Sequence, residues 1–199
     1  ITVFTDANTV TIDRTACSTA NCSGGTGAVG GATASFEGPA TNDLSDTLAD
    51  GHTVWVKNEA WNEAVVISTN FTAASSPVIE GYNASRDDDP TGTNRPLNNR
   101  ASAAGDGFVM NGNNGIVRNL RVSNAGDDGF VVNGSPGAMF VNCQGLNNTG
   151  DGFGRGASTG RSIALVDSEA NGNSARGIDI SGGTGSAFML GSYLHDNTS

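Results

Sequence analysis

The sequence predicts an all-β protein that coils as a right-handed, single-stranded parallel β-helix. Each rung takes about 22–25 residues, and a capping region precedes the first rung. Three observations lead to this prediction. The last half of the chain consists of near-repeats, apolar residues within each repeat alternate with a period of two, and one turn position carries Asn, Asn, Asp and Gly in successive copies. A helix would show a period of 3.6 instead.

Four copies of the repeat follow one another along the chain. A Gly-Phe or Gly-Ile pair recurs at intervals of 22, 23 and 25 residues, and its glycines are Gly107, Gly129, Gly152 and Gly177. The copies occupy residues 105–125, 126–149, 150–174 and 175–199. No copy can bury its apolar face alone, so neighbouring copies must stack.

Three sets of aligned residues are predicted to point inward. The first contains Phe108 and Met110 with their equivalents in later copies. The second is Val117, Phe140, Leu165 and Met189, and the third is Val122, Gly145, Ala170 and Leu194. Between the second and third sets stand residues that tolerate the left-handed backbone of a tight turn, namely Asn119, Asn142, Asp167 and Gly191. Stacked Asn side chains can also hydrogen-bond from one rung to the next.

The segment upstream of the repeats carries two further strand patterns. LSDTLADGHTVWVKNEAWNEAVVIS begins at Leu44 and contains Gly-x-Thr-Val-x-Val, and SPVIEGYNASRDDDPTG begins at Ser76 and contains Glu-Gly-Tyr. Together with the repeats, residues 44–199 resemble the pectate-lyase-like right-handed β-helix superfamily. That superfamily includes polysaccharide lyases and hydrolases and many phage tailspikes, so the resemblance implies the fold and leaves the chemistry open.

Two regions are expected along the chain. Residues 1–50 form a cap of strands and loops, with one or two strands near the start and a short helix at residues 42–49. Residues 51–199 form the rungs. A cap is expected because an open stack end exposes a strand edge. The other end shows no comparable cap, so either the chain is the front part of a longer β-helix or its last rung packs on another subunit.

Charge narrows the range of partners. The formal net charge is −10, and Lys57 is the one lysine. Nucleic acid is therefore not expected, because phosphate binding needs clustered Lys and Arg. No apolar run approaches the roughly 20 residues that span a bilayer. We expect an extracellular, cell-surface or virion protein whose partners are surface polysaccharide or other subunits, and the analogy with phage spikes implies a trimer.

The cysteines point to a local disulfide. Cys17 and Cys22 lie in CSTANC, where a disulfide is favoured over free thiols and implies an oxidising compartment. No His or further Cys pair lies nearby in the sequence to complete a zinc site. Cys143 lies in an apolar run and is expected to be a small core residue.

The candidate catalytic residues are Asp128, Asp151 and Arg155. Hydrolases of the resembled superfamily use clustered Asp residues as acid and base, and stacked rungs would bring the repeat's aspartates together. The competing interpretation, which we favour, is that Gly-Asp-Gly is the repeat's turn and that Asp accepts backbone N–H groups. Arg155 occupies an inward position, so we expect a bulge that sends it to the solvent as a carbohydrate contact.

Calcium and sugar rings are the other candidate ligands. Asp87, Asp88 and Asp89 form an acidic loop that could bind Ca²⁺, although such a run is more often simply solvated. Trp55 alternates with two valines and is expected to face outward, with Trp61 shortly after. The two rings either form a carbohydrate platform or pack beneath the amino-terminal cap.

Two functions remain open at this point. The first, which we favour, is a non-catalytic extracellular or virion-associated structural protein that binds surface glycans. It rests on the acidic surface, the regular rungs and the uncapped end. The alternative is a polysaccharide lyase or glycoside hydrolase acting on acidic glycans, which rests on the fold, the aspartates and Arg155. No catalytic motif of the superfamily can be carried over residue by residue.

Overall fold

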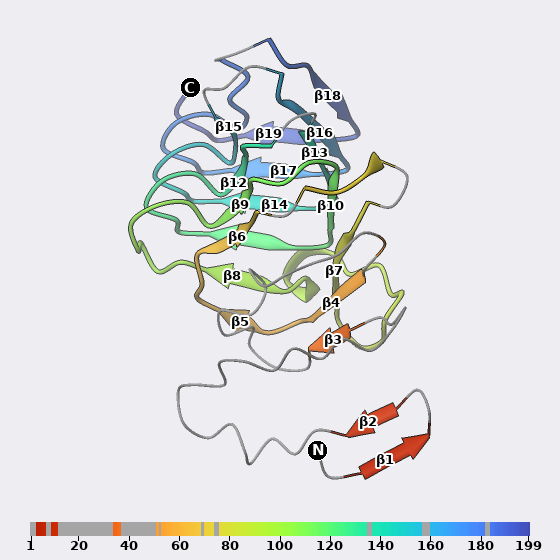
Figure 1. Ribbon diagram of the computed structural model, residues 1–199. Helices are drawn as coiled ribbons and strands as arrows, with labels where there is room; N and C mark the ends of the chain where they lie inside the picture. The colour runs from red at the N-terminus through yellow and green to blue at the C-terminus, as the bar shows by residue number, and fades with distance from the viewer. Residues whose placement is uncertain are drawn as a thin grey trace. The chain divides into compact units, whose positions relative to one another are not determined.

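The computed structural model describes residues 3–6, 9–11, 34–36, 51, 53–68, 70–73, 76–134, 137–156, 160–181 and 184–199. The chain divides into two compact units, Ile1–Gly30 and Gly31–Ser199. The first contains an antiparallel pair, β1 (Val3–Asp6) and β2 (Thr9–Thr11). The second is a parallel β-solenoid of about six turns (Figure 1). The predicted all-β, stacked-rung architecture is therefore confirmed.

Three parallel sheets run along the solenoid, because most rungs add one strand to each sheet. The seven-stranded sheet contains β3 (Ala34–Phe36), β4 (Thr53–Lys57), β7 (Val78–Tyr82), β10 (Gly115–Arg118), β13 (Gly137–Val141), β16 (Ser162–Val166) and β18 (Ala187–Leu190). The six-stranded sheet contains β5 (Ala60–Trp61), β8 (Leu97–Asn99), β11 (Arg121–Ser123), β14 (Gln144–Leu146), β17 (Glu169–Asn171) and β19 (Tyr193–His195).

The four-stranded sheet contains β6 (Val65–Ile67), β9 (Phe108–Met110), β12 (Phe130–Val132) and β15 (Phe153–Arg155). A short 3₁₀ helix, η3 (Gly92–Asn94), lies between β7 and β8. None of the helices in the described part of the chain has the length and apolar character that crossing a membrane requires.

The strand register confirms the second and third predicted inward sets, and the first from β9 to β15, whereas Ile180 in the last copy of the first set is 56% exposed. In the seven-stranded sheet Val117 pairs with Phe140, which pairs with Leu165, which pairs with Met189. In the six-stranded sheet the third set pairs in the predicted order. The first three residues of the second set have 0% exposure, whereas Met189 in the last rung is 41% exposed. Each inward residue is thus buried by the rung that follows it.

The predicted turn position is also confirmed. Backbone φ is +57° at Asn119, +52° at Asn142, +48° at Asp167 and +62° at Gly191, all in the left-handed region. The Asn142 Nδ2 atom donates to Asn119 Oδ1 over 2.6 Å, so the amides do bond from rung to rung. A second column of left-handed residues, which sequence reasoning missed, consists of Asn124, Asn147, Gly172 and Asp196.

Phenylalanines and asparagines share the interior of the solenoid. Phe108, Phe130, Phe140 and Phe153 each have 0% exposure, and the rings of Phe130 and Phe153 stack with centroids 5.1 Å apart. Burying one such side chain contributes roughly 1.5–3 kcal/mol. Beside them, the Asn148 amide donates to Asn173, and that of Asn173 donates to Asn197, over 2.9 and 2.8 Å. These amides satisfy each other and buried backbone groups, so their burial is tolerated.

The predicted cap is described only in part. β3 pairs with β4 in parallel, so residues 34–36 add a strand beside the first rung. The helix predicted at residues 42–49 lies outside the described residues, as do Cys17 and Cys22 with their predicted disulfide. Cys143 is a buried free cysteine with 0% exposure, as predicted, and burial raises the pKa of its thiol to about 12.

Candidate functional site

The aspartates of the Gly-Asp-Gly turns form a ladder along the solenoid. One oxygen of Asp106 accepts the backbone N–H of Asp128 over 3.2 Å. Asp128 Oδ1 accepts the N–H of Asp151 over 2.6 Å, and Asp151 Oδ1 accepts the N–H of Arg176 over 2.7 Å. Each carboxylate thus holds the turn of the next rung, which confirms the structural interpretation of the repeated aspartates.

A glycine, Gly154, lies where this ladder passes the third repeat. A Cβ at Gly154 would lie 2.2 Å from Oδ2 of Asp128, although the paired residues in earlier rungs are Val131 and Val109. Gly154 therefore accommodates the close approach of the Asp128 carboxylate to the backbone. The register of β12 with β15 is unbroken, so the predicted bulge at Gly154–Gly156 is not present in β15.

Protons are held unusually firmly in this ladder. Burial raises the pKa of Asp128 to about 6, and the nearby carboxylates of Asp151, Asp127 and Asp106 add to the rise against the hydrogen bond from the Asp151 backbone. The pKa values of Asp106 and Asp151 are also raised, in both cases mainly by burial. Asp128 is consequently half protonated near pH 6, whereas an Asp side chain in water is almost fully ionised at that pH.

Three acidic side chains converge beside the ladder. In the described part of the chain, Asp106, Asp127 and Asp128 each contribute one carboxylate oxygen to a group in which these three oxygens lie within 4.8 Å of one another. Such a group can share a proton or hold a cation. This spacing is shorter than the roughly 6.5–9.5 Å between the two carboxyl groups of an inverting glycosidase and closer to the roughly 5–5.5 Å of a retaining one.

Arg155 does not reach the solvent, so its predicted role as an exposed carbohydrate contact is wrong. Arg155 lies in β15, pairs with Val132 of β12 and is 6% exposed. Its guanidinium donates to the backbone oxygens of Arg161 (3.2 Å), Gly185 (2.6 Å) and Ile180. Backbone carbonyls of the neighbouring turns thus accept from the buried guanidinium, so the displacement to solvent that the sequence predicted does not occur.

The two tryptophans do not form an exposed platform either. Trp55 lies on the outward side of β4, because Val54 and Val56 on either side of it belong to the core, yet it is only 8% exposed. It contacts Tyr82 edge to face, with ring centroids 6.4 Å apart. Trp61 is 6% exposed and is part of the core. The prediction of surface rings that stack on sugars is therefore wrong for both residues.

The acidic loop at residues 87–89 is organised around one carboxylate. Asp88 accepts the backbone N–H groups of Asn83, Ala84 and Ser85 over 2.8–3.3 Å, and these bonds lower its pKa although burial acts in the opposite direction. Asp89 accepts from the Asn142 amide over 3.3 Å. Asp88 thus serves as a cap for its own loop, and the calcium prediction at these residues stays a prediction.

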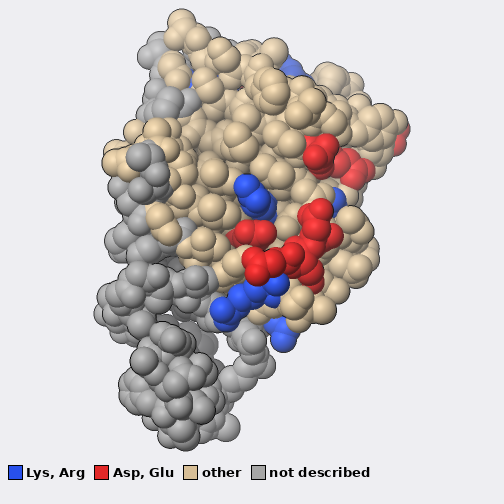
Figure 2. Space-filling model, turned by 90° about the vertical axis from the view of Figure 1, so that its right-hand side faces the viewer, with Lys and Arg blue, Asp and Glu red and all other residues tan. Residues whose placement is uncertain are grey.

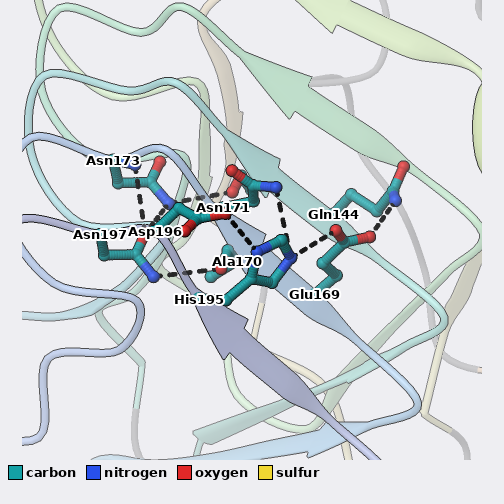
Figure 3. Close-up of polar contacts among 9 residues, drawn as sticks. Gln144, Glu169, Ala170, Asn171, Asn173, His195, Asp196 and Asn197 are labelled. Atoms are coloured by element: carbon teal, nitrogen blue, oxygen red, sulfur yellow. Dashed lines mark hydrogen bonds and ion pairs between the residues drawn. The ribbon is translucent and has the colours of Figure 1, made fainter.

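Sequence reasoning missed a polar cluster on the outer face of the six-stranded sheet. His195 lies between two carboxylates, with Nε2 3.0 Å from Glu169 Oε1 and Nδ1 2.8 Å from Asp196 Oδ2 (Figure 3). Asn171 lies 3.2 Å from Nε2, and Gln144 donates to the other oxygen of Glu169. Because carboxylates only accept, both contacts are satisfied when the imidazole is doubly protonated.

The charges of this cluster support each other. The hydrogen bonds to Asp196 and Glu169 raise the pKa of His195. Burial acts to raise the pKa of Glu169, but the hydrogen bonds from His195 and Gln144 outweigh it and lower that pKa. The signal for this cluster was present in the repeat, because aligning Ala170 with Leu194 places His195 beside Asn171 and Tyr193 beside Glu169.

Comparisons with known proteins add no relative. No family model, no curated protein and no solved structure matches the chain. The residues of the sites above therefore carry the functional argument.

Proposed function

We propose that the protein is a non-catalytic β-solenoid that serves as a structural component outside the cell or on a virion and binds surface glycans. The single observation that carries the proposal is the aspartate ladder. Its carboxylates, which a hydrolase would need as acid and base, hold the turns of successive rungs instead. The resemblance to phage spikes supports the location by analogy alone.

The surface that best fits a glycan is the outer face of the six-stranded sheet. Arg121, Gln144, Glu169 and Tyr193 follow one another in register there, with Asn171 and His195 beside them. Amide, carboxylate and imidazole groups can pair with sugar hydroxyls, and Tyr193, which is 63% exposed, offers a ring face. The net charge of −10 favours neutral glycans over acidic ones.

One observation favours the alternative, a lyase or hydrolase acting on acidic glycans. Asp128 with its pKa near 6 lies beside the exposed Asp127, and a protonated acid next to an ionised one is the pairing that glycoside hydrolysis uses. The three grouped residues are all acidic and include no cation that would neutralise a uronate, which weighs against this function.

A glycan panel tests both functions. The protein is incubated with alginate, pectate, chondroitin and neutral polysaccharides, with and without Ca²⁺, and binding, unsaturated products and reducing ends are followed. We expect binding of a neutral polysaccharide that Tyr193→Ala weakens at least tenfold, with no product. Asp127→Asn is the control, because it touches only the alternative site. Product release that Asp127→Asn abolishes would establish the alternative, and no binding to any glycan would refute the glycan part of the proposal.

A further inference from the structure

The outer face of the seven-stranded sheet carries two columns of side chains. Strand register aligns one column as Val78, Ile116, Met139, Ala164 and Phe188, and the other as Glu80, Arg118, Val141, Val166 and Leu190. The residues that alternate with them on β7, β10, β13 and β16 are buried in the core. Both columns therefore point away from the core.

The later rungs make this face apolar. From β13 onward every member of the two columns is apolar, and Met139, Phe188 and Leu190 are 38%, 57% and 58% exposed. Figure 2 views this side of the molecule, and its charged residues gather over the lower rungs while the upper strands are mostly uncharged. On the neighbouring six-stranded sheet the equivalent positions of β14 and β17 are polar except Leu146, which shows that the repeat does not require an apolar outer surface.

The earlier rungs give this face a balanced charge. Arg118 pairs in register with Glu80. Burial raises the pKa of Glu80, Arg118 acts to lower it, and the carboxylates of residues 87–89 add to the rise. Lys57 lies on the same face at the end of β4, and Arg86 belongs to the acidic loop itself. Three cations thus accompany four carboxylates here, whereas the whole chain has 10 cations and 20 carboxylates.

We propose that this face binds a second copy of the same chain. An isologous contact places the same patch of both copies together, so it must be attractive to itself. Two chains of net charge −10 repel each other over most of their surface. This face combines an uncharged apolar stretch with a nearly balanced charged one, so two copies can meet here with apolar packing and without like-charge repulsion.

Analytical ultracentrifugation of the full chain tests this inference. We expect the wild type to sediment as a dimer at micromolar concentration. Met139→Glu should weaken association at least 100-fold, because it places two carboxylates across the contact. The matched control is Leu146→Glu, an apolar residue in the same rung on the outer face of the six-stranded sheet, which should leave association unchanged.

Other occupants give different results. A wild type that is monomeric at every concentration would overturn the proposal, as would an oligomer that Met139→Glu leaves intact. Hydroxyl-radical labelling of Met139 tests whether another part of the same chain covers this face. Protection that increases with concentration supports the second copy, whereas protection that is the same at every concentration means that the chain covers the face itself. Glycan binding is also measured for the monomeric variant. If that variant still binds glycan, the proposed function does not depend on this contact, so the two proposals can fail separately.

Discussion

The Asp128 carboxylate accepts the backbone N–H of Asp151 over 2.6 Å, one rung further along the solenoid. The same contact links Asp106 to Asp128 and Asp151 to Arg176. The main role of a carboxylate in this position is to accept a hydrogen bond from the turn of the next rung. Its raised pKa follows from the same burial that makes the bond strong.

Replacing Asp128 by Asn should change how stability depends on pH. The folded pKa of about 6 exceeds the usual 3.8, so the folded state holds this proton more firmly than the unfolded state. The stability from this group is complete below pH 3.8 and is lost as the pH rises through 6. The full shift corresponds to about 3 kcal/mol, and solvent screening reduces the expected loss to about 1 kcal/mol. Urea unfolding at pH 4 and 7 should show Asp128→Asn gaining relative to the wild type by that amount; equal curves would contradict it.

Replacing Asp88 by Ala should loosen the loop at residues 83–90. The carboxylate accepts three backbone N–H groups there, and losing such a cap costs about 1 kcal/mol. Thermal unfolding of Asp88→Ala, beside the exposed Asp127→Ala as a control, measures the loss. Repeating the scan with Ca²⁺ tests the calcium prediction. A rise in Tm that only Asp88→Ala abolishes would show that the carboxylate serves a metal.

Replacing Arg155 by Met should free the turn near the end of the solenoid. Met fits an inward column that contains Met110 and Val132, but it cannot donate to the carbonyls of Arg161, Ile180 and Gly185. A lost hydrogen bond to a charged donor is worth about 1.5–3 kcal/mol. Amide hydrogen exchange in residues 184–186 should become at least tenfold faster, whereas Arg118→Met should leave it unchanged. Unaltered exchange in Arg155→Met would show that the guanidinium does not hold this turn.

His195 should titrate above the usual value of 6.5. Its pKa is raised by hydrogen bonds to Asp196 and Glu169, so its contribution to the last rung is complete below pH 6.5 and is lost as the pH rises through the raised value. An NMR titration of the imidazole should show the raised pKa, and Glu169→Gln should lower it. Asp167→Asn, at an exposed turn, is the control. A wild-type value at or below 6.5 would contradict the double hydrogen bond.

The repeat predicted the fold well because a parallel stack fixes its own geometry. Val117, Phe140 and Leu165 align because each rung must bury the one before it, and Asn119 lies where the turn needs a left-handed backbone. Side chains that depend on another segment were predicted poorly. Arg155 is held by carbonyls from turns up to 30 residues away, which no local pattern records.

Trp55 and His195 also have surroundings that depend on distant segments, which the local sequence does not record. Strand alternation correctly placed Trp55 on the outward side, but it could not show that other groups would leave the ring only 8% exposed. The sequence around His195 shows no partner for it, because its partners Glu169 and Asn171 lie a full rung earlier in the sequence. The repeat alignment already paired those positions, so applying it to polar residues as well as apolar ones would have found the cluster.

Unfolding of Asp128→Ala beside Asp128→Asn tests most directly whether the acidic turns are scaffold. At pH 4.5 the wild-type carboxyl is mostly protonated, so the comparison isolates the hydrogen bond to Asp151. Asp128→Ala should lose about 1–3 kcal/mol because the Asp151 N–H loses its acceptor, whereas Asp128→Asn should stay within about 0.5 kcal/mol because its amide oxygen still accepts. If Asp128→Ala is as stable as the wild type, the carboxylate is not structural and its role must be sought in chemistry.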